Sequence, residues 1–370
     1  MKRLELTVLC LLALLLSLPL PAAGRAEEPH RRFVPADSVL FFDARRTNFR
    51  FAAACVDTGL RPQATEAGSL SARGVRKARK AWETDVAAGL NAVGGRGDEL
   101  QGEQTFAAAR AARASARLFL LTGEGRCFDV VDRVLYNALP SALLPEAPFF
   151  ERRVAAQTML DATGWIYAAD GEGVYVNLYA NCYASIRTPG FCLTLDQITS
   201  LPTEPRVRFR VGGLPRGFTR FKLRLRLPEW GGGAAAVAGL LPAAESGERP
   251  PVVYVNGRET PCETENGYIV IERDWRNRDE VFFDFDLRPR LVRRAADGAC
   301  AWRRGPEWFL FQAGAVAALP GTGTQEEVEA DLTATAGLVL RFPGGVQAVS
   351  YGAVAPQERA GWRLWEMQGR

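Results

Sequence analysis

Cysteine and histidine are among the residues that could supply a nucleophile, a general base or a soft-metal ligand. The 370 residues include seven cysteines and a single histidine, His30. A Ser-His-Asp triad or a histidine zinc site would therefore depend on a residue close to the N-terminus. We expect His30 to be an exposed tail residue. Because no Cys-x-x-Cys occurs, the sequence does not support a thioredoxin-like or zinc-ribbon site.

The N-terminus has the features of a secretory signal peptide. Lys2 and Arg3 precede an apolar core at residues 8–20, and small residues follow as far as Ala26. The core is too short to span a bilayer comfortably, and no second long apolar run follows it. The sequence therefore predicts a signal peptide at 1–26 and a secreted or periplasmic protein with no other membrane contact.

The remaining cysteines allow two interpretations. An exported chain meets an oxidising compartment, where an even number of cysteines permits disulfides. Cys182 and Cys192 are close enough in sequence to bridge a hairpin. The alternative is that the cysteines are small buried apolar residues. After removal of Cys10 with the signal, the set is Cys55, Cys127, Cys182, Cys192, Cys262 and Cys300.

Composition and charge are those of an ordinary globular protein. Hydrophobic residues make up 47% and charged residues 24% of the chain. The formal net charge is +4, and the cationic side chains are interleaved with acidic ones, so no basic stripe is evident. Nucleic-acid binding is therefore not expected.

The first half of the chain is helical in pattern. Residues 27–69 contain scattered proline and glycine and predict only an irregular segment. From residue 70, apolar side chains recur every three or four positions, and Gly94 and Gly95 end that helix. Further helices are predicted at 103–121, 126–139 and 152–162, the third ended by Pro140. Paired helices of this kind suggest part of a bundle or barrel at 70–163.

From residue 164 the apolar period changes to two. Val174, Val176 and Leu178 alternate with polar or aromatic residues, and Asn256-Gly257 and Asn266-Gly267 are hairpin turn signals. Such alternation predicts antiparallel sheets with one solvated face. The fold class expected is α+β multidomain, with a partial helical barrel followed by two antiparallel β-sandwich domains at 164–287 and 288–370. Residues 231–251 are predicted to be a flexible insertion.

Five segments together resemble the β-L-arabinofuranosidases of glycoside hydrolase family 127. They are KARKAWETDVAAGLNAVGGRGDE (77–99), RLFLLTGEGRCFDVVDRVLYNAL (117–139), GWIYAADGEGVYVNLYANCYASI (164–186), LRLRLPEW (223–230) with VYVNGRE (253–259) and GYIVIERDW (267–275), and AWRRGPEWFLF (301–311). The resemblance implies a barrel of paired helices followed by two β-sandwiches. Only the last part of that barrel has a counterpart here.

The resemblance also implies a catalytic site, which this sequence does not reproduce. Family members use a zinc-bound cysteine nucleophile, with the metal held by three Cys and one Glu, and a separate Glu as acid/base. The Glu-Thr-Cys motif is replaced by Gln104, Thr105 and Phe106, and the adjacent cysteines by FFERR at 149–153. Amide and phenyl groups are not zinc ligands of the required kind. We therefore expect no zinc cofactor and assign no catalytic residue.

Surviving acidic residues near these positions are Asp98, Glu99, Glu103 and Glu151. A pair of carboxyl groups without a metal can cleave a glycosidic bond. The simpler interpretation is that these are solvated acids of loops and helix starts.

Aromatic side chains of the second half are the other candidates, since aromatic faces suit sugar C–H surfaces. The alternative is ordinary core and interdomain packing. The set is Tyr175, Tyr179, Tyr183, Trp230, Trp275, Trp302 and Trp308.

The function expected is that of a secreted, catalytically inactive relative of these hydrolases, with a carbohydrate-binding role or a structural role in packing against another chain. An incomplete helical layer should expose apolar surface, and this favours a homo- or hetero-oligomer. The alternatives are an active glycoside hydrolase with a rearranged site and a non-functional gene fragment.

Overall fold

The described part of the chain begins within the N-terminal segment and ends before the last five residues. The computed structural model describes residues 34–35, 38–41, 63, 65, 70–101, 104–188, 190–215, 218–233, 240–242, 250–294, 296–313, 328–331 and 338–365. The predicted signal peptide, His30, Cys55, Glu103 and most of the predicted insertion at 231–251 lie outside these residues. Within the described residues, no helix has the length and apolarity needed to cross a membrane.

The helical layer has the four predicted stretches, with shifted ends. Ser71 caps the first helix by accepting a hydrogen bond from the Gly74 amide at 3.2 Å. We predicted that the third stretch ends at Pro140, but it continues through this residue. Proline is tolerated in the first turn of a helix, and a new helix begins at Leu139. The elements are α2 (Ala72–Ala81), the π-helical η1 (Trp82–Ala87), α3 (Gln104–Thr122), α4 (Cys127–Arg133), the π-helical η2 (Val134–Ala138), α5 (Leu139–Ala142) and α6 (Phe149–Thr163).

Two sheets follow and share one hydrophobic core with the helices. The first has the order β1 (Val34–Pro35), β3 (Tyr167–Ala169), β4 (Gly173–Val176), β8 (Phe218–Arg226), β13 (Tyr268–Arg276) and β12 (Glu263–Glu265). The second has the order β11 (Arg258–Glu259), β10 (Tyr254–Val255), β14 (Glu280–Asp284), β7 (Arg206–Gly212), β6 (Cys192–Thr199), β5 (Cys182–Arg187) and β2 (Ser38–Phe41). The segment 27–69, predicted to be irregular, thus supplies a strand to each sheet.

The turn predictions are confirmed by the backbone. Asn256 and Gly257 have φ of 51° and 77°, and Asn266 and Gly267 have φ of 52° and 82°. Two successive left-handed residues are what a two-residue hairpin turn of the Asn-Gly type requires.

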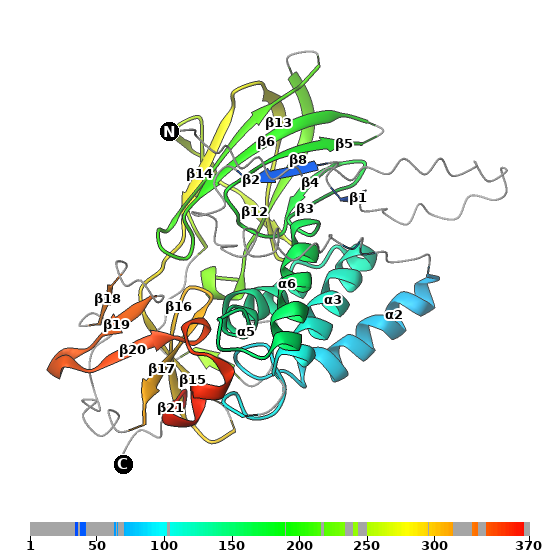
Figure 1. Cartoon of the computed structure of the whole chain (residues 1–370). Helices are drawn as coiled ribbons and strands as arrows, with labels where there is room; N and C mark the ends of the chain where they lie inside the picture. Colours follow the sequence, from blue (N-terminus) through cyan, green and yellow to red (C-terminus); the bar gives the residue numbers. More distant parts are fainter. Residues whose placement is uncertain are drawn as a thin grey trace, which may run out of the picture.

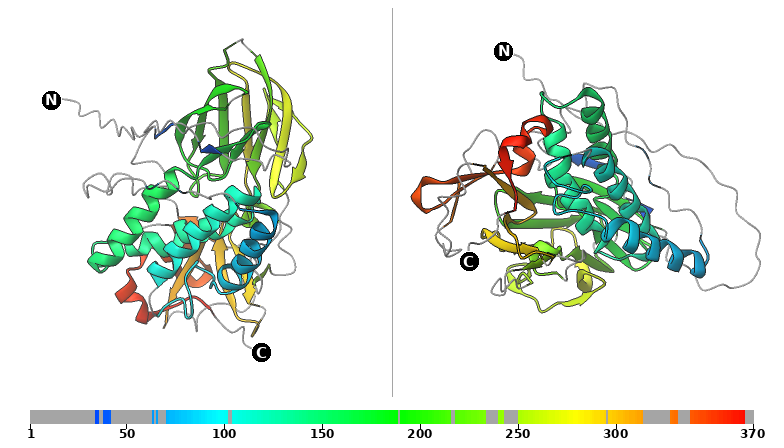
Figure 2. Two further views of the ribbon diagram at one scale, coloured as in Figure 1. Left: turned by 90° about the vertical axis from the view of Figure 1, so that its right-hand side faces the viewer. Right: turned by 90° about the horizontal axis from the view of Figure 1, so that it is seen from below.

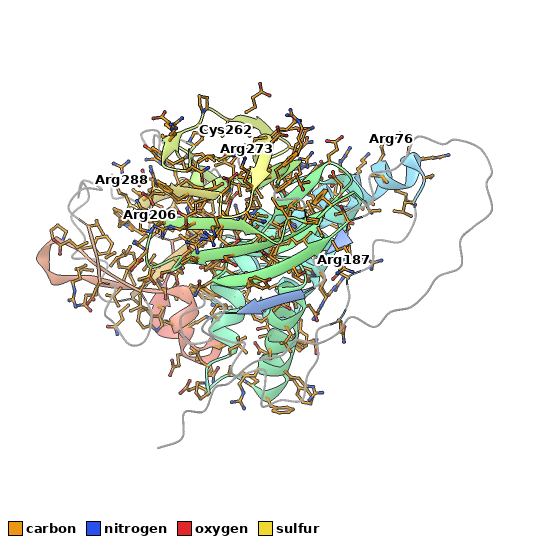
Figure 3. All side chains as sticks on the ribbon, turned by 90° about the horizontal axis from the view of Figure 1, so that it is seen from above. Arg76, Arg187, Arg206, Cys262, Arg273 and Arg288 are labelled. Carbon is orange, nitrogen blue, oxygen red and sulfur yellow. The ribbon has the colours of Figure 1, made fainter. Side chains whose placement is uncertain are left out.

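Alternation of buried and exposed residues holds on the second sheet but fails on the first. Along β7 the core residues alternate with outward arginines, one of which, Arg206, pairs with Asp284 at 2.8 Å (Figure 3). Along β4 every residue is buried, although one solvated face was predicted. The helical layer covers that face (Figure 1), and the Phe119 ring of α3 lies 5.9 Å from Tyr175.

A third sheet lies beside the helical layer (Figure 2). Asn137 of η2 joins them, because its side chain donates to the Pro306 carbonyl at 3.0 Å and accepts from the Trp308 amide at 2.9 Å. We predicted a C-terminal β-sandwich, which requires two sheets. The described residues of 288–370 contribute to only one sheet. The order is β18 (Glu329–Asp331), β19 (Val339–Arg341), β20 (Gln347–Ser350), β17 (Glu307–Gln312), β16 (Cys300–Arg304), β15 (Arg290–Arg294) and β9 (Leu240–Pro242), with β21 (Trp362–Arg363) also on β17.

Candidate functional site

Gln104, at the first position of α3, holds the preceding loop in place. Its side chain is 1% exposed. The amide nitrogen donates toward the carbonyl oxygens of Arg96, Asp98 and Gln101 at 2.9, 2.5 and 2.8 Å. The amide oxygen accepts from Asn91 Nδ2 at 2.8 Å. Both ends of the amide are therefore engaged, and the oxygen, which is the only amide atom that could bind a metal, already accepts from Asn91.

Thr105 and Glu151 join the starts of two neighbouring helices. The Thr105 hydroxyl donates to Glu151 Oε2 at 2.6 Å, and Glu151 lies in the first turn of α6. A carboxylate near a helix N-terminus is stabilised there by the helix dipole. This hydrogen bond holds the N-terminal turns of α3 and α6 next to each other.

Three phenyl rings stand exposed at these two helix starts, and we call them the aromatic face. Phe106, on α3, is 40% exposed, whereas Phe149 and Phe150, on α6, are 61% and 73% exposed. The rings of Phe149 and Phe150 contact each other edge to face, with centroids 5.7 Å apart. Large apolar side chains gathered at one place on a surface are typical of a binding surface.

The candidate acids do not form a free catalytic pair. Asp98 accepts from the Leu100 and Gln101 amides and closes a turn. We predicted that Glu99 is solvated, but its side chain is buried. Trp365 Nε1 donates to its carboxylate at 3.0 Å. Glu151 is engaged by Thr105, and Glu103 lies outside the described residues.

The described cysteines are unpaired thiols. Of the two interpretations, burial as small apolar residues holds for Cys127, Cys182 and Cys300. Cys182 and Cys192 do not bridge the hairpin, because strand register pairs Cys182 with Gln197 and Cys192 with Arg187. Burial raises the pKa of the Cys182 thiol to about 12, and burial also raises the pKa of Cys127. Neither thiol ionises readily, so neither is suited to act as a nucleophile.

The residues around α3 and α6 do not fit the zinc site that the resemblance implies. Gln104 offers an amide already bound to the backbone, and Phe106 and Phe149 offer only phenyl rings. In the part of the chain that the structure describes, no three His, Cys, Asp or Glu side chains are grouped to hold a metal ion. The donor set that zinc prefers is replaced by groups of the wrong chemistry.

The aromatic residues proposed as a sugar platform are core residues, apart from the half-buried Tyr183. Tyr175 and Tyr179 pack against other rings of the shared core, and Trp275 stacks on Phe221. Six of the seven are buried, the most exposed of them being Trp302 at 8%, so they present no open face to a sugar: Tyr175, Tyr179, Trp230, Trp275, Trp302 and Trp308.

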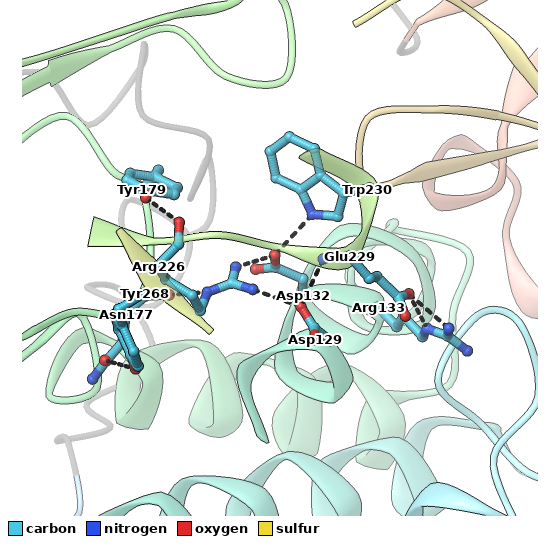
Figure 4. A network of polar contacts seen from close by, with 9 residues as sticks. All are labelled: Asp129, Asp132, Arg133, Asn177, Tyr179, Arg226, Glu229, Trp230 and Tyr268. Atoms are coloured by element: carbon cyan, nitrogen blue, oxygen red, sulfur yellow. Dashed lines mark hydrogen bonds and ion pairs between the residues drawn. The ribbon is translucent and has the colours of Figure 1, made fainter. Parts of the chain in front are cut away.

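A buried ionic network ties the helical layer to the first sheet (Figure 4). Arg226 of β8 donates to Asp129 at 2.8 Å and also to Asp132, both on α4. Asp132 in turn accepts from Trp230 Nε1 at 2.9 Å. Burial raises the pKa of both carboxyl groups, and the adjacent guanidinium opposes that rise.

The network continues on both sides of Arg226. Arg133 directs two nitrogens at Glu229 Oε1, at 2.6 and 2.8 Å. On the other side, Tyr268 donates to Asn177 Oδ1 at 2.7 Å. The buried ionic network was not predicted from the sequence. The feature that could have revealed it is the pair of aspartates three positions apart on the mostly apolar helix α4, because buried acids need a cationic partner.

The comparisons with known proteins agree with the architecture. Residues 173–287 match the family described as β-L-arabinofuranosidase, GH127 middle domain. A comparison with curated proteins found no match.

Solved structures with the same fold include a GH127 β-arabinofuranosidase, at 23% identity and a TM-score of 0.64, with 77% of this chain and 54% of that chain covered. A GH127 β-L-arabinofuranosidase from Geobacillus stearothermophilus T6 is 18% identical, with a TM-score of 0.59 and coverage of 77% and 55%. A protein described as a glycoside hydrolase is 18% identical, with a TM-score of 0.59 and coverage of 78% and 61%.

This chain therefore spans between about half and three-fifths of the length of those structures. Residues 173–287 match the GH127 middle domain, and the chain has the fold of GH127 β-L-arabinofuranosidases over about 77% of its length.

Proposed function

We propose that this chain is an exported, non-hydrolytic protein of GH127 fold whose helical layer binds another polypeptide. The observation that carries the proposal is the aromatic face at the starts of α3 and α6, where Phe106, Phe149 and Phe150 are 40%, 61% and 73% exposed. Phenylalanine is enriched at protein interfaces, and burying such rings is strongly favourable. The occupant we propose is a second copy of the chain.

The loss of hydrolytic activity is proposed from the chemistry of the same region. The amide nitrogen of Gln104 donates to backbone carbonyls, and Asp98, Glu99 and Glu151 each accept hydrogen bonds within the protein. The thiols of Cys127 and Cys182 are buried and resist ionisation. An assay on aryl β-L-arabinofuranosides, with and without added zinc, should give no hydrolysis above the uncatalysed rate. Zinc-dependent hydrolysis that is lost in Glu103→Gln would instead support a rearranged active site.

Light scattering coupled to size-exclusion chromatography tests self-association. The wild type should elute with a mass above that of one chain, and Phe149→Ser/Phe150→Ser should shift the mass toward a single chain. Phe218→Ser is the matched control, because Phe218 is also an exposed phenyl ring, at 60%, but lies on β8. A wild type that is monomeric at every concentration, or an equal effect of the control, would contradict the proposal.

A further inference from the structure

The helix α2 carries a run of cations with no acid among them. Residues 70–82 include no Asp or Glu. Arg73, Arg76, Lys77 and Lys80 follow one another at spacings of three, one and three, and all four are exposed. Residues three and four apart lie on the same face of a helix, so these side chains form one line about 10 Å long. We call this line the basic stripe.

The opposite side of α2 attaches the helix to the rest of the molecule. Ala78 packs against the shared core, and Arg79 Nη2 lies 2.5 Å from Glu124 Oε1. The stripe therefore faces outward, and Figure 3 shows Arg76 at the margin of the molecule. The expectation from the sequence that the chain has no basic stripe is therefore wrong for α2, because the exposure of this face makes the four cations a single surface.

The stripe is electrostatically unfavourable without a partner. Within the described residues, none of its four cations forms an ion pair. The next acid along the chain, Glu83, is engaged by Arg126 at 2.6 Å. Like charges three or four positions apart on a helix destabilise it, and the stripe has four such pairs. A ligand with repeated negative charges would relieve this repulsion.

We propose that the basic stripe binds a linear anionic polysaccharide with a carboxylate on successive sugars. A line of four charges suits a single polyanionic chain. A membrane surface fits less well, because the exposed apolar residues of α2, Ala72 and Ala81, are too small to anchor the helix in a bilayer. Single-stranded nucleic acid fits less well too, because α2 has no aromatic side chain on which a base could stack.

Binding of the purified chain to polygalacturonate, measured between 50 and 200 mM salt, tests the proposal. If four cations engage, affinity should fall on the order of a hundredfold over this range, since counterions are released at each contact. Arg76→Ala/Lys77→Ala should weaken binding and reduce that fall to about tenfold. Arg208→Ala/Arg258→Ala, which removes two exposed cations from β7 and β11, should bind as the wild type does.

Neutral and competing probes complete the experiment. Fully methyl-esterified polygalacturonate should not bind. Equal binding of the ester, an equal effect of both double variants, or tighter binding to duplex DNA or to anionic phospholipid vesicles would overturn the proposal. The stripe variant should keep the oligomeric mass of the wild type, so failure here is distinct from failure of the proposed self-association.

Discussion

At the scale of single residues, Gln104 ties the loop before α3 to the start of that helix. Its amide nitrogen sits among three backbone carbonyls, and its oxygen accepts from Asn91. A carboxylate cannot make the donor interactions, and it would place a negative charge against carbonyl oxygens. The glutamate that the resemblance implies at position 104 is therefore incompatible with the hydrogen bonds that Gln104 makes.

Gln104→Glu should accordingly destabilise the fold. We expect the free energy of unfolding to fall by about 2–3 kcal/mol, because a buried charge would lack its donors. Urea denaturation followed by circular dichroism measures it. Gln101→Glu is the control, since that side chain is exposed, and it should change stability by less than about 0.5 kcal/mol. Equal stabilities of the two variants would show that Gln104 does not hold the loop.

The buried thiols give a second prediction at this scale. Because the pKa of Cys182 is raised to about 12, its thiol is protonated at pH 8, and burial protects Cys127 in the same way. Both should resist iodoacetamide in the folded protein and react once it is unfolded, while Cys262 is partly accessible. Mass spectrometry of alkylated peptides measures this. Rapid native labelling of Cys182 would contradict the burial described for β5.

Some residue roles could be read from the sequence and others could not. The Asn-Gly turns were predictable because left-handed backbone favours those residues locally. The placement of Glu99 was not, since its partner Trp365 is far along the chain. The choice between a Cys182–Cys192 bridge and buried thiols stayed open in the sequence, because spacing does not fix strand register.

At the scale of elements, the contact between α4 and β8 depends on one guanidinium. Arg226 is shared between Asp129 and Asp132, and its side chain is about 1% exposed. Burial alone would lower the pKa of Arg226, but the two carboxylates hold it above its usual value. Removing the cation would leave two buried acids without compensation.

Arg226→Met should therefore cost about 3–5 kcal/mol of unfolding free energy. Arg206→Met is the matched control, because Arg206 pairs with Asp284 on the exposed surface and such pairs contribute about 0–1 kcal/mol. Thermal unfolding of both variants compares them. A loss for Arg226→Met no larger than that for the control would mean that packing alone holds the helices to the sheet.

The same contact explains which strand patterns could be predicted. On β7, buried and exposed residues alternate because one face of that strand meets solvent. On β4 and the second half of β8, helices cover the other face, so the side chains there are buried as well. Local periodicity cannot reveal a layer contributed by a distant segment.

At the scale of the whole molecule, the chain has the fold of GH127 β-L-arabinofuranosidases over about 77% of its length. The order of helical and strand segments could be predicted from periodicity, and the family from five segments. The strands at 34–35 and 38–41 and the single described C-terminal sheet were not predicted, because short edge strands and sheet pairing depend on long-range contacts.

The account predicts separate uses for two surfaces of this fold. The aromatic face at α3 and α6 is proposed to associate with a second chain, and the basic stripe on α2 to bind a polyanion. Both depend on the premise that the helix starts no longer form a metal centre.

Zinc content tests that premise most directly. The purified chain is incubated with an equimolar amount of zinc, desalted, and analysed by inductively coupled plasma mass spectrometry. The account predicts that the metal is lost on desalting, because Gln104 and the phenyl rings of Phe106 and Phe149 offer no suitable donors. Retention of one zinc ion per chain, abolished by substitution in residues 104–106 or 149–153, would contradict it.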